Sequence, residues 1–195
     1  FWDILRFPDG SIGVAVADVA GKGLAASLIM ASVKSALPLL GFADGIAGIM
    51  ATLNRKLHAE LGKREFVAIA LLRYDPGTGE AELANAGLPD PYLVSTTGVE
   101  PVVVGGPRLP VGMRADLNYE TVKFSLREGE SVVMLTDGLP EALAGGEPLG
   151  YDRLAAILAE TARDGVDAIL GGVNAVATAD DDQTVVALSR VGRMQ

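Results

Sequence analysis

Residues 8–18 read PDGSIGVAVAD and combine a turn, a short strand and an acidic strand end. The turn signal Pro8–Ser11 predicts that an alternating strand over Phe1–Phe7 folds back on a second strand over Ile12–Ala17. One face of this second strand carries only glycine and alanine. So small a face suits close packing against another layer, and we expect that layer to be a second sheet.

Helical periodicity replaces this alternation after the loop Val19–Gly23. Two apolar stripes predict two amphipathic helices. Their members are Met30, Val33, Leu37 and Leu40 in the first, and Ile46, Ile49, Met50, Leu53, Leu57 and Leu61 in the second. The apolar stretch Ser35–Asn54 is interrupted by Pro38 and several glycines. We therefore expect two helices joined by a turn, and no membrane insertion.

Further strands are predicted by apolar runs that end in turn signals. They cover Phe66–Leu72, Glu80–Ala86, Tyr92–Ser95, Val99–Val104, Leu117–Leu126, Ser131–Thr136 and Thr184–Ser189. Between the last two strands, helical spacing returns at Leu154, Ile157 and Leu158 and at Val166, Ile169, Leu170 and Val173. Hairpin-connected strands with helices inserted in pairs indicate an α+β fold of two stacked, mainly antiparallel β-sheets flanked by helices. No linker composition interrupts the chain, which favours a single domain over residues 1–195.

The composition excludes several classes of mechanism. The 195 residues include 25 acidic and 16 basic side chains, a single histidine and no cysteine. This excludes a cysteine nucleophile, a disulfide framework, a thiolate zinc site and a two-histidine metal site. The net charge of -9 argues against a nucleic-acid partner and an anionic membrane surface, and leaves cation binding open. No signal-peptide pattern opens the sequence, so we expect a cytoplasmic location.

Carboxylates stand where three of the predicted strands begin or end. Asp18 and Asp137 each follow a strand, whereas Asp180–Asp182 precede the last strand. If the last strand runs antiparallel to the other two, these acids meet at one edge of the sheet. Two bare carboxylates about 4 Å apart repel by about 4 kcal/mol at an effective dielectric near 20, so such a cluster requires cations or protons. Oxygen ligands favour Mg²⁺ or Mn²⁺, which can activate a water for attack on a phosphate.

Each of these residues also has a purely structural interpretation. A single aspartate at a strand end commonly serves a turn or a helix cap. The segment Gly21-Lys22-Gly23 could form a backbone nest for an anion, but it lacks the spacing and the hydroxyl residue of a P-loop. His58 lies beside Lys56 and Glu60, which indicates a solvated helix face.

Four short blocks occur in order along the chain: DVAGKGLAAS at 18–27, NAG at 85–87, LTDGLPEA at 135–142 and DDQT at 181–184. In this order they resemble the sequence blocks of the PPM-type metal-dependent serine/threonine phosphatases, in the bacterial SpoIIE/RsbU-like branch. The resemblance covers essentially the whole chain and implies an αββα sandwich. It also implies that the chain is a fragment of a longer protein, without its N-terminal residues and an upstream sensor or receiver domain.

The resemblance further implies a centre of two Mn²⁺ or Mg²⁺ ions. Asp18 would bridge the ions and the Val19 carbonyl would be a further ligand. Asp137 and Asp181 would bind the more buried ion, which makes Asp18 and Asp137 the catalytic candidates. Contacts to the substrate or to neighbouring loops are expected from Gly21, Lys22, Gly23, Asn85, Gly138 and Asp182.

Two departures from the family pattern bear on activity. Phe1-Trp2-Asp3 matches only the tail of the family's opening block, Gly-Gly-Asp-aromatic-aromatic-Asp. The first aspartate of that block would lie before Phe1, so one of the two metal sites is expected to be weakened. Leu88 stands where the family often has a histidine after Asn-Ala-Gly, and this bears on loop packing or substrate contact.

The substrate implied for this branch is a phosphorylated STAS-domain anti-anti-sigma factor, whose dephosphorylation frees a sigma factor. Two alternatives stay open. One is a catalytically silent binding module in a partner-switching pathway, and the other is a carboxylate-metal hydrolase of small phosphate esters.

Overall fold

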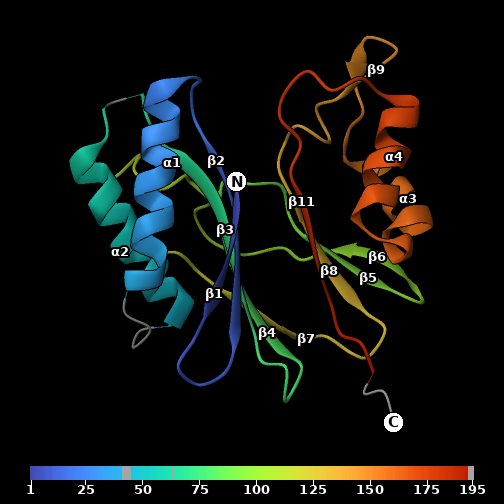
Figure 1. Ribbon diagram of the computed structural model, residues 1–195, viewed down its shortest axis with the longest axis horizontal. Coiled ribbons are helices and arrows are strands. Elements are labelled where there is room, and N and C mark those ends of the chain that lie inside the picture. Colours follow the sequence, from blue (N-terminus) through green and yellow to red (C-terminus); the bar gives the residue numbers. More distant parts are fainter. Residues whose placement is uncertain (41–44, 63, 193–195) are drawn as a thin grey trace. The chain divides into compact units, whose positions relative to one another are not determined.

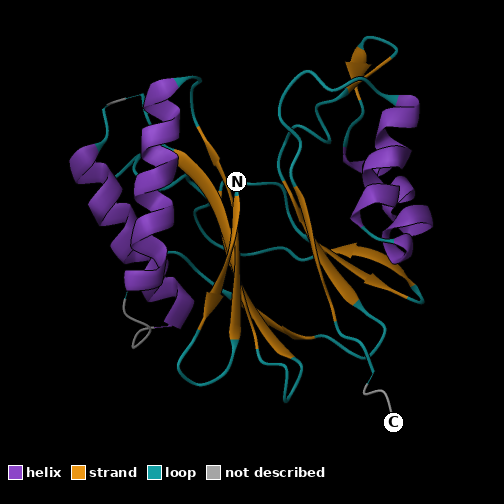
Figure 2. Cartoon of the chain, in the orientation of Figure 1, coloured by secondary structure: helices purple, strands orange, loops and turns teal. Residues whose placement is uncertain are grey.

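The computed structural model describes residues 1–40, 45–62 and 64–192. The chain forms two compact units (Figures 1 and 2). The first unit comprises Phe1–Leu88 and Val104–Ser125, and the second comprises Pro89–Val103 with the chain from Leu126 onward. Both units contain an antiparallel sheet and helices, which confirms the α+β class. In the described ranges, every helix is too short or too polar to cross a membrane.

The first unit is a five-stranded antiparallel sheet with two helices on one face (Figure 1). Its strands lie in the order β1-β2-β3-β4-β7. The bounds are β1 Trp2–Arg6, β2 Ile12–Val19, β3 Val67–Tyr74, β4 Glu80–Ala86, β7 Val122–Ser125, α1 Leu24–Ala36 and α2 Gly45–Glu60, with a 3-10 turn at Leu37–Leu39. Both predicted hairpins and the two intervening helices are confirmed, whereas the turn predicted between the helices lies partly outside the described residues.

The hairpin between β1 and β2 is closed by the Asp9 carboxylate. Asp9 accepts hydrogen bonds from the Ser11 hydroxyl at 2.6 Å and the Ser11 N–H at 3.0 Å, and it pairs with Arg73 of β3. The bonds from Ser11, together with the Arg73 guanidinium, lower the pKa of Asp9 to about 2. The turn is therefore fixed both within the hairpin and to the neighbouring strand.

The small face of β2 packs against helices. Ala15 and Ala17 are fully buried in the same cluster as Val33 of α1. Their short side chains let the helix layer come close to the strand. Gly13 has no room for a side chain, because a Cβ there would lie 2.7 Å from the Phe7 ring. The small face was predicted correctly, but the prediction that a second sheet covers it is wrong.

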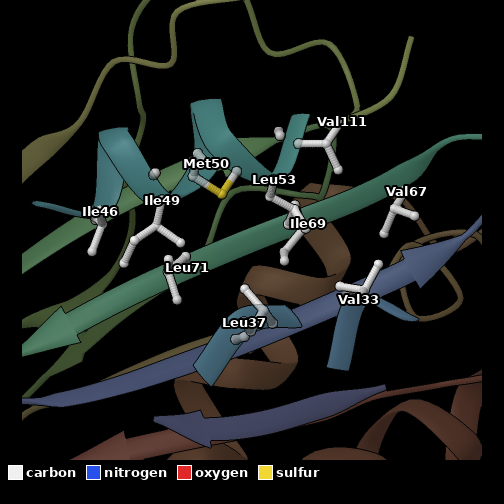
Figure 3. Packing of buried hydrophobic residues seen from close by; sticks show 14 of the residues in the cluster. Val33, Leu37, Ile46, Ile49, Met50, Leu53, Val67, Ile69, Leu71 and Val111 are labelled. Atoms are coloured by element: carbon white, nitrogen blue, oxygen red, sulfur yellow. The ribbon is translucent and has the colours of Figure 1, made fainter. Parts of the chain in front are cut away.

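The helix stripes and β3 form the core of the first unit (Figure 3). The predicted α2 stripe is confirmed, since Ile46, Ile49, Met50, Leu53 and Leu57 are fully buried. In α1 the prediction is wrong at Met30, which is 36% exposed, whereas Ile29 is buried. Positions four apart share a helix face, so Ile29, Val33 and Leu37 form the stripe that packs on the sheet.

The strand predicted over Leu117–Leu126 is shorter, since β7 begins only at Val122. The preceding loop is held against α2 by the buried amide of Asn54. Asn54 donates to the Arg114 carbonyl at 2.8 Å and accepts from the Gly112 N–H at 2.9 Å. These bonds fix the course of residues 112–115 and tie the loop before β7 to α2.

The second unit is a four-stranded antiparallel sheet in the order β11-β8-β5-β6, covered by two helices (Figure 1). The bounds are β5 Tyr92–Ser95, β6 Gly98–Pro101, β8 Ser131–Leu135, β11 Val185–Ser189, α3 Tyr151–Thr161 and α4 Val166–Val176, with a 3-10 turn at Ala162–Asp164. A short hairpin, β9 Leu143–Ala144 with β10 Glu147–Pro148, was not predicted, because strands of two residues show no periodicity. β6 ends at Pro101, before the predicted end at Val104.

Replacement of Asp9 by asparagine should lower the free energy of unfolding at neutral pH. In acid the difference between wild type and variant should disappear, because Asp9 becomes protonated in both the folded and the unfolded chain. The folded pKa of about 2 lies below the ordinary value of 3.8, so the stabilisation is present above the ordinary value and is lost as the pH falls through about 2. Urea unfolding midpoints of wild type and Asp9→Asn should differ at pH 7 and converge as the pH approaches 2. Asp116→Asn, the same change at another exposed position, is the matched control; a difference for Asp9→Asn that is as large at pH 2 as at pH 7 would contradict the assignment.

Candidate functional site

The carboxylates of the second unit lie at one edge of its sheet. β8 and β11 are antiparallel, with Leu135 opposite Val185, so the end of β8 meets the start of β11. Asp137 follows β8, and Asp180–Asp182 precede β11. The antiparallel relation on which the expected convergence depends is present between these two strands. It brings Asp137 to the same sheet edge as Asp181 and Asp182.

Hydrogen bonds connect the two acidic segments. The Thr136 N–H donates to the Thr184 carbonyl at 3.1 Å, which extends the ladder one residue beyond β8. The Gln183 amide donates to the Gly138 carbonyl at 3.2 Å. Within the second segment, the Asp182 N–H donates to Oδ1 of Asp181 at 2.9 Å and orients that carboxylate. The segments that carry Asp137 and Asp181 are thus held together by bonds on both sides of Asp137.

Gly138 permits the close approach of these segments. A Cβ at this position would lie 2.4 Å from the Asp182 carbonyl oxygen and 3.4 Å from that of Asp181. Both neighbours are main-chain atoms, which cannot swing aside as the end of a side chain can. Gly138, predicted as a substrate or loop contact, is therefore required here for space between the two acidic segments.

In the first unit, Asp18 stands at the exposed end of β2. It lies opposite Ala68 of β3, and the ladder continues through a bond of 3.0 Å from the Ala20 N–H to the Phe66 carbonyl. The chain then turns at Gly21 and Gly23, whose φ angles of 103° and 78° favour glycine.

Lys22 is exposed between these two glycines, directly before α1. The first turn of α1 contains no acidic residue and no side-chain cap. Its N–H groups and the Lys22 ammonium are therefore positive groups on the loop that follows Asp18.

Asn85 holds the turn at the end of β4. Its buried amide accepts from the Leu88 N–H and donates to the Leu88 carbonyl, both at 3.0 Å. Arg108 donates to the same carbonyl at 2.9 Å, and a Cβ at Gly87 would lie 2.7 Å from Pro110. Arg108 and Pro110 were missed in the sequence, because their role depends on a turn that is about 20 residues away.

The donor set fits hard divalent cations. Asp18, Asp137 and Asp181 offer carboxylate oxygens, which are the ligands that Mg²⁺ and Mn²⁺ prefer. In residues 1–40, 45–62 and 64–192, no three His, Cys, Asp or Glu residues gather closely enough to hold an ion. Asp18 belongs to the first unit and the other two acids to the second, so the meeting of all three stays a prediction.

The first unit contains a cavity of about 330 Å³ that lies away from Asp18. Its lining includes Arg73, Glu82 and Lys123, from three adjacent strands. Arg73 lies opposite Gly13, five residues before Asp18 on β2, and this spacing corresponds to roughly 17 Å along the strand. The cavity is thus distant from the predicted metal ligand of this unit.

Comparison with known proteins identifies one family. The family model "Stage II sporulation protein E (SpoIIE)" matches residues 8–191, a range that contains all four sequence blocks. Among curated proteins, the chain is 27% identical over 133 residues to phosphoserine phosphatase RsbU of Bacillus subtilis (strain 168). The match covers 67% of this chain but only 39% of RsbU.

Solved structures share the fold. The RsbU and RsbW domains of Rv1364c from Mycobacterium tuberculosis match with a TM-score of 0.81 and 22% identity, over 100% of this chain and 57% of that one. RsbX in complex with magnesium matches with a TM-score of 0.69 and 17% identity, over 96% of this chain and 84% of that one. At such identities the likeness establishes the fold alone.

Replacement of Gly138 by alanine should destabilise the second unit, because its Cβ would overlap the Asp182 carbonyl. We expect a loss of about 1–3 kcal/mol in the free energy of unfolding, measured by urea titration. Gly171→Ala in α4 is the control, since a Cβ there has no neighbour within 4 Å and alanine favours a helix by about 0.5–1 kcal/mol. Equal effects of the two substitutions would contradict the assigned close approach.

Proposed function

The chain belongs to the SpoIIE family of PPM-type phosphatases, and from this membership we propose that it is a metal-dependent serine/threonine phosphoprotein phosphatase. The observation that carries the proposal is the family match over residues 8–191, because this range includes Asp18, Asp137 and Asp181 in their expected blocks. The absence of cysteine supports a mechanism in which water, and not a thiol, attacks the phosphate.

Carboxylates and one carbonyl would hold the ions. In the proposal, Asp18 and the Val19 carbonyl from the first unit would hold Mn²⁺ or Mg²⁺ together with Asp137 and Asp181 from the second. When bound, such ions lower the pKa of a water and offset the charge of a phosphate ester. The magnesium in the RsbX structure supports this choice of ion.

The groups around Asp18 would bind the phosphate. The Lys22 ammonium and the N–H groups at the start of α1 are positive and follow Asp18 directly in the chain. They can hold a phosphoserine dianion while the carboxylates hold the cations. In the second unit, the contacts of Gly138 and Asp182 serve to hold Asp137 and Asp181 in place.

The proposed substrate is a phosphorylated STAS-domain protein. RsbU is a phosphoserine phosphatase by name, and the Rv1364c structure contains an RsbW domain beside its RsbU domain, which supports a place in partner switching. The chain spans less than half the length of RsbU. Control by an upstream sensor or receiver domain is part of the proposal.

Substitution of either proposed ligand should abolish hydrolysis. Asp18→Asn and Asp137→Asn each remove a negative ligand, and a loss of several kcal/mol of transition-state stabilisation corresponds to about 100-fold or more in kcat/KM. The assay is Mn²⁺-dependent release of phosphate from a phosphoserine STAS-domain protein. Asp116→Asn, at an exposed position of the first unit, should leave the rate unchanged.

Three measurements separate this function from the alternatives. Full activity in excess chelator would exclude a metal-dependent enzyme. Tight Mn²⁺ binding without turnover would favour the silent binding module. Equal kcat/KM on an aryl phosphate and on the phosphoprotein would favour a hydrolase of small esters.

A further inference from the structure

The ladder between β8 and β11 ends with a side chain in place of a backbone carbonyl. In a regular antiparallel pair, Thr136 and Thr184 would exchange two backbone hydrogen bonds. The Thr136 N–H does donate to the Thr184 carbonyl at 3.1 Å. The return bond, however, runs from the Thr184 N–H to the hydroxyl oxygen of Thr136, at 3.0 Å.

This exchange lets the backbone leave the strand at Asp137. The Thr136 carbonyl is turned toward the next residues and accepts from the Leu139 N–H at 3.4 Å. The Asp137 carbonyl accepts from the Glu141 N–H at 2.9 Å, which continues the turn. Thr136 is only 3% exposed, so its hydroxyl satisfies a bond that water does not readily replace.

The same hydroxyl reaches the other acidic segment. It lies 3.4 Å from the Asp182 carbonyl, toward which it can donate. On the far side of Asp137, the Gln183 amide donates to the Gly138 carbonyl at 3.2 Å. Two side chains therefore bridge the segments of Asp137 and Asp181, one on each side of Asp137.

The end of β2 provides a contrast. There the ladder runs past Asp18 through a backbone bond from the Ala20 N–H to the Phe66 carbonyl. The side-chain substitution at the end of β8 thus has no counterpart in the bond from Ala20 to Phe66 that continues β2.

We propose that Thr136 and Gln183 are positioning residues that hold Asp137 and Asp181 at a fixed separation for a shared divalent cation. The proposal rests on the proposed function only in that these two acids bind metal. Groups that orient metal ligands from outside typically contribute about 10- to 100-fold to metal affinity. A preset separation avoids the cost of bringing two repelling carboxylates together when the ion arrives.

The test is a calorimetric titration of the intact chain with Mn²⁺ alone. Thr136→Val keeps the shape but removes the hydroxyl, and it should weaken Mn²⁺ binding by about tenfold or more. Thr136→Ser keeps the hydroxyl and should bind within about twofold of wild type. Thr161→Val is the matched control, because this hydroxyl donates to the Ile157 carbonyl within α3, and its Mn²⁺ affinity should not change.

Hydrogen exchange gives a second readout that needs no metal. The Thr184 amide should lose protection in Thr136→Val and keep it in Thr136→Ser, while the thermal midpoint shows whether each variant is folded. Gln183→Met removes the second bridge at a less buried position, and it should weaken Mn²⁺ binding by about threefold or more even if Thr136→Val does not fold.

The outcomes are distinguishable. Unchanged Mn²⁺ affinity in folded Thr136→Val and Gln183→Met would overturn the proposal, whatever the activity of the chain. A wild-type chain that binds Mn²⁺, loses affinity in both variants and hydrolyses no phosphoprotein would support the positioning role and contradict the proposed function.

Discussion

Backbone pairing on both edges of β3 is the interaction on which the first unit depends. This strand lies between β2 and β4, and its Ile69 is opposite Ala17 on one side and Ala86 on the other. Side chains alternate between faces, so a slip of one residue would turn Ile69 out of the helix-covered core. It would also move Asp18 relative to Ala68. The buried stripe of α2 therefore fixes the register that places Asp18 opposite Ala68 near the end of β2.

In the second unit, helix packing again fixes the strand register, but here the register brings two acidic segments together. Its helices pack on one face of the sheet through residues such as Leu154, Leu158 and Ile169, which are fully buried. This packing sets the register of β8 with β11 and brings two acidic segments together. Like charges at one edge oppose that arrangement, so the segments are bridged by Thr136 and Gln183. Structural bonds and the proposed metal chemistry thus concern the same few residues.

Charge and donor chemistry agree with the family assignment. A chain with 25 acidic residues, one histidine and no cysteine has few ligands other than oxygen to offer an ion. His58, an exposed residue, contacts the Gly112 carbonyl at 2.9 Å through Nδ1 and belongs to the contacts between α2 and the loop before β7. Hard divalent cations are accordingly the ions that carboxylates such as those at its strand ends favour.

The sequence by itself determined the features that depend on neighbours in the chain. Alternation and helical spacing located most strands and the α2 stripe, and strand ends located Asp18, Asp137 and Asp181, because these signals are local. Tertiary structure decided the rest. The course of the loop before β7 is set by the hydrogen bond from Asn54 to Arg114, which lie 60 residues apart. The turn at Asp137 depends on the bond between Thr184 and Thr136, which lie 48 residues apart. Such bonds form only after packing has brought distant segments together, so no local pattern records them.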